Sequence, residues 1–421
     1  MAVKRQRVSP SVQERVLGMR LATRVKLSAM MFLQYMMLPV WLNTVIPYIK
    51  TLPGGDSWVL WCGMIIGIGN LASPIFGMLA DRMISAEKLL ALSNLIYAVL
   101  MGLSCFVSDP ALLFALLVAC AILNLPGWAL SASIAMGASS SSEFASVRVF
   151  GSLGWVASSV FSIVAIGYFG YAEFDTSRWI FAAAACTALV GAFVAYIQPA
   201  TPPKALGSKI SFVDAFGLRA FSLFKRSDFA IFVTLVVLSM VPFMWYMTYN
   251  TQYLQESGFK YLNLTQNLGT VGELGFMLLV PVLVKKFGYR WSMVIALCAL
   301  AFRYICFGAS VALDCHIFDF GGILIHGLIF GVIIVGAQMY VEDTAPAGLK
   351  NQAQGMIMTL MTSLGTFISV LLFDGILGYG KRADGTHDWF VAFAVAAVIS
   401  IALAVCMSVT ASSSKRVNSA S

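Results

Sequence analysis

The stretch WFVAFAVAAVISIALAVCMSVTA, residues 389–411, carries no charged side chain at any of its 23 positions. About 20 apolar residues in a helix are long enough to cross the ~30 Å hydrocarbon core of a membrane. Inside lipid, only a helix or a closed barrel satisfies every backbone group, and this stretch lacks the polar–apolar alternation of a barrel strand. It is therefore predicted to be a membrane-spanning helix.

Eleven further apolar runs of similar length precede this stretch. They fall near residues 27–48, 57–80, 88–107, 111–136, 148–170, 178–198, 228–253, 264–285, 291–312, 318–341 and 353–378. The predicted fold is an all-α membrane protein with twelve transmembrane helices in two six-helix halves. The predicted segments are an N-terminal segment (1–26), an N-terminal half (27–198), a linker (199–227), a C-terminal half (228–411) and a tail (412–421).

Composition and charge agree with a membrane protein. Hydrophobic residues make up 59% of the 421 positions and charged residues only 11%, whereas soluble domains carry about 25% charged residues. The basic residues behind the net charge of +8 gather in the N-terminal segment, the linker and alternate loops, which is the positive-inside distribution. Both termini and the linker are therefore expected in the cytoplasm, and binding to nucleic acid is not expected.

The eight cysteines form no C-x-x-C pair, so we expect neither a metal nor a cofactor.

A carrier of small solutes is the function that this topology favours. The sequence contains no H-E-x-x-H, G-x-S-x-G or Walker motif, so we do not expect an enzyme or an ATP-driven pump. A membrane-embedded enzyme and a sensor without transport activity are the alternatives from other classes. A sensor would usually be joined to a soluble signalling domain, which the short predicted tail does not provide.

Two charged residues inside apolar runs are candidates for the chemistry of transport. A charge at the centre of a membrane helix costs about 3 kcal/mol or more, so each one needs a reason. Glu273 can carry a proton, bind substrate, or lock two helices together through an arginine. Arg148 can clamp a polar substrate or pair with Glu273, and its alternative is a place at the cytoplasmic interface, paired with Glu143.

The segment GMLADRMISAEK, residues 77–88, follows the second apolar run. Its Gly77, Asp81 and Arg82 resemble the cytoplasmic G-x-x-x-D-R signature of the major facilitator superfamily, whose carriers have two six-helix halves. In that fold the substrate binds between the halves. The resemblance implies that these three residues form a conformational lock on the cytoplasmic side.

Four stretches resemble the bacterial nucleoside–proton symporter branch of that superfamily. They are FLQYMMLPVW (32–41), EFASVRVFGSLGW (143–155), LGTVGELGFMLLVPVLVKKFG (268–288) and HGLIFGVIIVGAQMYVEDTAP (326–346). The resemblance implies a monomeric secondary active transporter in the bacterial inner membrane, which takes up nucleosides with protons by alternating access. It implies proton coupling through Glu273 and Arg148. It implies substrate contacts from Arg148, Ser152, Trp155, Tyr246, Glu273 and Phe330.

The sequence departs from this branch at several polar positions. Phe243 and Tyr246 occupy the positions of an amide pair, Thr270 that of a glutamine, and Gly331 that of an aspartate. A sugar, an organic acid or a modified nucleoside on the same fold is therefore an alternative cargo.

Other polar residues within apolar runs have open roles. Gln34 and Asn250 can donate to substrate in the cavity or link helices to each other. Whether Arg303, His326 and Asp374 take part in transport is left open, and a satisfied core histidine is the simpler interpretation of His326.

Overall fold

The computed structural model describes residues 21–139, 141–203, 218–277, 279–346, 349–383 and 385–420, and these ranges are almost entirely helical. Within them, the only bridge between extended segments joins Lys381 and His387. The prediction of an all-α membrane protein is confirmed. Within the described ranges, ten helices are long and apolar enough to cross a membrane, or eleven if the bent pair Gly55–Gly63 and Ile65–Arg82 counts as one span. The predicted count of twelve is not confirmed.

The N-terminal half contains helices broken at several points. Its elements are α2 (Leu21–Met36), α3 (Pro39–Leu42), α4 (Val45–Ile49), η1 (Gly55–Trp58), α5 (Val59–Gly63), α6 (Ile65–Asn70), α7 (Ser73–Arg82), α8 (Ala86–Ser104), α9 (Pro110–Ala138), α10 (Ser141–Ala157), α11 (Val160–Ser162), η2 (Ile163–Tyr168), η3 (Phe174–Thr176) and α12 (Trp179–Tyr196). Pro39 and Pro47 interrupt the first apolar run, because proline removes a backbone donor from the helix. Asp109 caps α9 by accepting a 2.8 Å hydrogen bond from the Leu112 backbone.

The C-terminal half follows the linker. Its elements are η4 (Leu218–Lys225), α14 (Ser227–Glu256), α15 (Leu262–Met277), α16 (Val280–Leu313), α17 (Ile317–Leu324), α18 (His326–Phe330), η5 (Gly331–Val335), α19 (Gly336–Thr344), α20 (Lys350–Thr359), η6 (Leu360–Leu364), α21 (Gly365–Tyr379) and α22 (Trp389–Ala420). The eighth predicted run is divided between α15 and the start of α16. Gly288 has a φ of 77°, a conformation that only glycine adopts readily, and it turns the chain inside α16.

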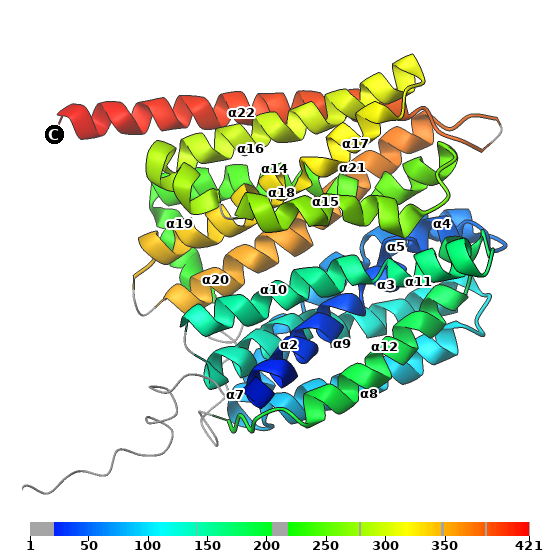
Figure 1. Ribbon diagram of the computed structural model, residues 1–421. Coiled ribbons are helices and arrows are strands. Elements are labelled where there is room, and N and C mark those ends of the chain that lie inside the picture. Colours follow the sequence, from blue (N-terminus) through cyan, green and yellow to red (C-terminus); the bar gives the residue numbers. More distant parts are fainter. Residues whose placement is uncertain are drawn as a thin grey trace, which may run out of the picture.

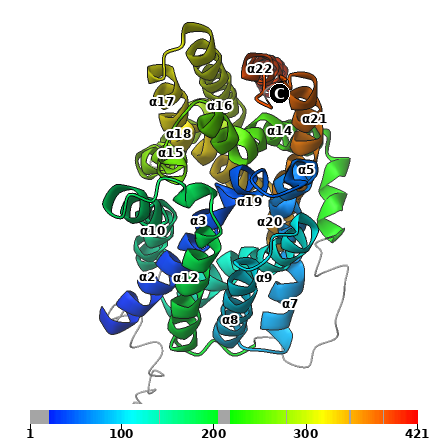
Figure 2. The same ribbon diagram turned by 90° about the vertical axis from the view of Figure 1, so that its right-hand side faces the viewer.

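The two halves lie side by side as two bundles, with α2–α12 in one and α14–α22 in the other (Figure 1). A view along the bundles shows the same division (Figure 2). Between the halves α10 packs against α15, α6 against η6, and α14 against α4. The beginning of α2 and the end of α22 lie at the same end of the molecule (Figure 1).

Large apolar side chains remain exposed on the outer faces of the bundles. On α8 they are Leu92, Leu95, Ile96 and Val99, which are 41–56% exposed. Their spacing places them on one helical stripe. An exposed apolar stripe of this size on a span-length helix is the surface that lipid would cover.

Candidate functional site

Arg148 on α10 is held against an aromatic residue of α2. Its guanidinium carbon lies 4.3 Å from the centre of the Tyr35 ring, a distance typical of a cation–π contact. A Cβ at Gly151 would come within 2.7 Å of the Arg148 Nη1 and 3.1 Å of Tyr35. Glycine at this position therefore leaves the space in which the guanidinium and the ring meet.

Glu273 on α15 approaches this arginine from the other half. It is 7% exposed, and its helix α15 packs against α10, the helix that carries Arg148. A Cβ at Gly327 would come within 2.5 Å of the Glu273 backbone nitrogen, so glycine allows α18 to touch α15 at this residue. The structure thus places the two predicted charged residues on packed helices of opposite halves, and over the described residues no ion pair within 4.0 Å joins them.

Aromatic rings extend the site on the N-terminal side. Trp128 stacks on Tyr35 with ring centres 5.0 Å apart, and Trp155 meets Trp128 edge-on at 5.9 Å. Ser152 is buried one turn from Trp155 on α10. Arg148, Ser152 and Trp155 therefore lie along one stretch of α10, and their substrate contacts stay a prediction. Trp128 is a neighbour that the sequence analysis missed.

A second aromatic cluster lies in the C-terminal half. The Phe243 ring centre is 5.7 Å from that of His326 and 6.4 Å from that of Phe330. Tyr246 is 5.4 Å from His326. The predicted contacts Tyr246 and Phe330 are thus joined through His326, a residue whose role the sequence leaves open.

The two amide candidates are engaged with neighbouring side chains. The Gln34 oxygen accepts a 3.0 Å hydrogen bond from Asn94, and its nitrogen donates to the Asn124 carbonyl at 3.3 Å. Asn250 donates to Gln266 of α15, and its own oxygen is buried without a partner. These contacts favour the helix-linking alternative for Gln34, while Asn250 keeps one free acceptor.

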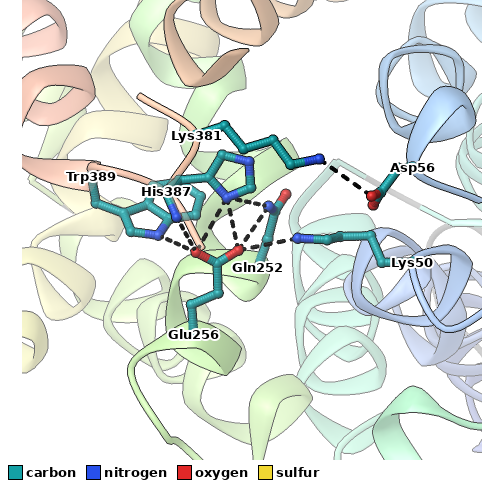
Figure 3. A network of polar contacts seen from close by, with 7 residues as sticks. All are labelled: Lys50, Asp56, Gln252, Glu256, Lys381, His387 and Trp389. Carbon is teal, nitrogen blue, oxygen red and sulfur yellow. Dashed lines mark hydrogen bonds and ion pairs between the residues drawn. The ribbon is translucent and has the colours of Figure 1, made fainter. Parts of the chain in front are cut away.

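Ion pairs join the two halves at one end of the molecule, near η1 and the segment between α21 and α22 (Figure 3). Lys50 Nζ lies 3.2 Å from Glu256 Oε1, and Lys381 Nζ lies 3.3 Å from Asp56 Oδ2. Glu256 also accepts hydrogen bonds from the His387 backbone nitrogen at 3.0 Å and from Trp389 Nε1 at 2.8 Å. We call this part of the molecule the closed end.

Buried amides reinforce the closed end. Asn43 Nδ2 donates to Asn263 Oδ1 at 2.7 Å and to Asn267 Oδ1 at 3.0 Å. Asn267 Nδ2 in turn donates to Ser158 and Ser159, each at 2.9 Å. These bonds connect α15 with the junction between α3 and α4 and with the junction between α10 and α11, and the sequence analysis did not find them.

The predicted lock residues Gly77, Asp81 and Arg82 lie on α7, at the opposite end of the N-terminal half (Figure 1). Asp81 is exposed at the end of α7, and a Cβ at Gly77 would meet nothing within 4 Å. The lock predicted for Gly77, Asp81 and Arg82 stays a prediction. Asp374 lies beside Tyr249 within the C-terminal half. The contacts described above join the two halves at the closed end.

The chain is similar to known proteins over most of its length. Residues 21–416 match the family model of nucleoside H⁺ symporters. The chain is 29% identical to YegT of Escherichia coli (strain K12), over 91% of this chain and 92% of YegT. It is 27% identical to the xanthosine permease of the same organism, over 90% of this chain and 94% of the permease.

Solved structures support the fold. The nucleoside transporter NupG has a TM-score of 0.79 at 19% identity, covering 93% of this chain and 99% of NupG. The D-xylose–proton symporter has a TM-score of 0.69 at 14% identity, covering 92% of this chain and 97% of that protein. The predicted major facilitator fold is confirmed, as is a transporter rather than an enzyme. The chain belongs to the nucleoside H⁺ symporter family.

Proposed function

We propose that this transporter carries nucleosides together with protons, and that Arg148 and Glu273 form the centre of its site. The observation that carries the proposal is the placement of a guanidinium and a buried carboxyl on packed helices of opposite halves, with clusters of aromatic rings in both halves. Rings can stack on a flat base, and the two charged groups can hydrogen-bond to its polar edge or to the sugar.

Alternating access follows from the same arrangement. The two halves, residues 27–198 and 228–411, would rock about this centre. A cytoplasmic linker, residues 199–227, would join them. The closed end would face the periplasm, so that the structure would represent a state closed toward the periplasm. We propose a monomer in the bacterial inner membrane with both termini in the cytoplasm, in accord with the distribution of basic residues.

Proton coupling would pass through Glu273. A protonated carboxyl is neutral and does not attract Arg148 as a carboxylate does. Proton binding to Glu273 would therefore weaken the electrostatic attraction between the two halves. One charge that moves through 100 mV gains about 2.3 kcal/mol. This energy supports roughly 50-fold accumulation of a neutral solute, so one proton per nucleoside is sufficient.

The test measures uptake into proteoliposomes that contain the purified protein. A proton gradient directed into the vesicles is imposed during uptake. Labelled uridine, inosine, xanthosine and D-xylose would be offered with and without a protonophore. We expect nucleosides to accumulate and the protonophore to abolish accumulation. Accumulation of D-xylose alone would instead support the alternative cargo.

Glu273→Gln tests the coupling residue. Glutamine resembles the protonated carboxyl, so we expect exchange of labelled for unlabelled nucleoside to continue while accumulation against a gradient is lost. Glu342→Gln is the matched control, because Glu342 forms an exposed 2.9 Å pair with Lys350 away from the site. Wild-type accumulation by Glu273→Gln would contradict the assignment.

A further inference from the structure

A buried arginine lies behind the aromatic cluster of the C-terminal half. Arg303 on α16 is 0% exposed, and its guanidinium carbon lies 4.0 Å from the centre of the Tyr246 ring. Over the residues that the structure describes, no carboxylate forms an ion pair with it. A buried cation of this kind is costly inside a membrane helix, so its contacts indicate what it is for.

The contacts of Arg303 fix the state of a histidine. Its Nε donates to the Gly322 carbonyl at 3.0 Å, and its Nη2 lies 3.0 Å from His326 Nδ1. A guanidinium has only donors, so His326 Nδ1 must be the acceptor. His326 is therefore the neutral tautomer with its proton on Nε2. A protonated imidazole would set two donors and two positive charges against each other.

The imidazole lies among the rings proposed to hold the substrate. Its ring centre is 5.7 Å from Phe243, 5.4 Å from Tyr246 and 6.0 Å from Phe330. Gly327, the next residue, is in contact with the Glu273 backbone. Glu273 and the His326 ring thus lie at one crossing of α15 and α18. His326 keeps 5% of its surface exposed, whereas Arg303 behind it has none.

We propose that His326 is a substrate-recognition residue whose Nε2–H donates to a keto oxygen on the edge of the base. Arg303 is its positioning residue, because it holds the tautomer that presents this donor. The inference rests on the proposed nucleoside transport. Phe243 and Phe330, which neighbour the imidazole, have no polar side-chain group, so His326 supplies a polar contact that these two rings do not.

The test compares nucleosides with analogues that lack one keto oxygen, in proteoliposomes containing the full chain. Inosine is paired with purine riboside, and uridine with 2-pyrimidinone riboside. His326→Phe keeps a ring but removes the donor, so we expect the KM for the keto nucleoside to rise about fivefold. Its effect on the analogue of the same pair should be much smaller, and the maximal rate should change little.

His326→Gln provides the rescue, because the glutamine amide nitrogen can occupy the place of Nε2 and donate. We expect this variant to restore the preference for the keto nucleoside. Arg303→Met should reduce that preference, since His326 then loses the donor that fixes its tautomer. The control is His316→Gln, because His316 is half-exposed and pairs with Asp319 outside the cluster; its preference should equal that of the wild type.

The outcomes separate this inference from the function on which it rests. Loss of the keto preference in His326→Phe with recovery in His326→Gln supports the inference. Equal KM changes for both members of each pair, or no change, overturn it while nucleoside transport stands. Failure of the wild type to take up any nucleoside overturns both.

Discussion

Individual residues at the interface of α2 and α10 decide how closely these helices pack. A Cβ at Gly154 would overlap the carbonyl oxygen of Phe32, so only glycine allows this approach. Tyr35 and Arg148 lie within two helical turns of this contact. The close approach of the helices therefore also sets the distance between their side chains. Packing and site geometry therefore depend on the same small side chain.

Gly154→Ala is expected to destabilise the protein by about 1–3 kcal/mol, because the backbone of Phe32 has to move. Gly102→Ala is the matched control: Gly102 also lies in a helix, but a Cβ there would meet nothing within 4 Å. The control should be as stable as the wild type or more so. Thermal unfolding in detergent, followed by size-exclusion chromatography, measures both. Equal melting temperatures for the two variants would contradict the assignment.

At the scale of elements, hydropathy predicted where helices occur but not where they break. Each of the twelve apolar runs coincides with helix, yet several runs are divided: the first among α2, α3 and α4, and the eighth between α15 and α16. Hydropathy averages side chains over a window, whereas a break depends on single residues such as Pro39, which begins α3 inside the first run. The resemblance identified Arg148, Trp155 and Glu273, which the structure does bring close to the interface.

Contacts between distant elements could not be predicted from one sequence. Asn43 and Asn263 are 220 positions apart, and only the packing of the halves brings them together. The pairing of Arg303 with His326 is likewise a product of how α16 and α18 cross. A polar residue in an apolar run signals that some partner exists, but the sequence does not say which one.

The elements of the closed end are expected to separate more easily when an ion pair between them is removed. Glu256→Gln removes the charge that attracts Lys50, and a partly exposed pair contributes about 0.2–1 kcal/mol. The population with the closed end open should therefore rise about 1.4- to fivefold. Spin labels at the exposed residues Thr51 and Lys260 would report longer distances between the halves.

Lys350→Gln serves as the control for this measurement. It removes a 2.9 Å pair with Glu342 that lies within the C-terminal half. The distance distribution between the labels should match that of the wild type. Identical distributions for Glu256→Gln and Lys350→Gln would show that the Lys50 pair does not hold the closed end.

For the whole molecule, the distribution of basic residues predicts its orientation in the membrane. The linker contains Lys204 and Lys209, which trypsin can cut. We expect cleavage into two halves in inside-out vesicles and an intact chain in right-side-out vesicles, because the linker is predicted to be cytoplasmic. Gel electrophoresis of the two preparations distinguishes the outcomes, and cleavage only in right-side-out vesicles would reverse the orientation.

In the proposed orientation, the closed end would also offer a way to control the transporter from the periplasmic side. Its surface is assembled from both halves, through Lys50 and Asp56 on one side and Glu256 and Lys381 on the other. This composite epitope exists only while the halves are together. An antibody fragment selected against it would stabilise that state by about 2.7 kcal/mol at a concentration of 100 times its Kd. Such a reagent would inhibit uptake without competing for the nucleoside, and it would leave the substrate pocket untouched.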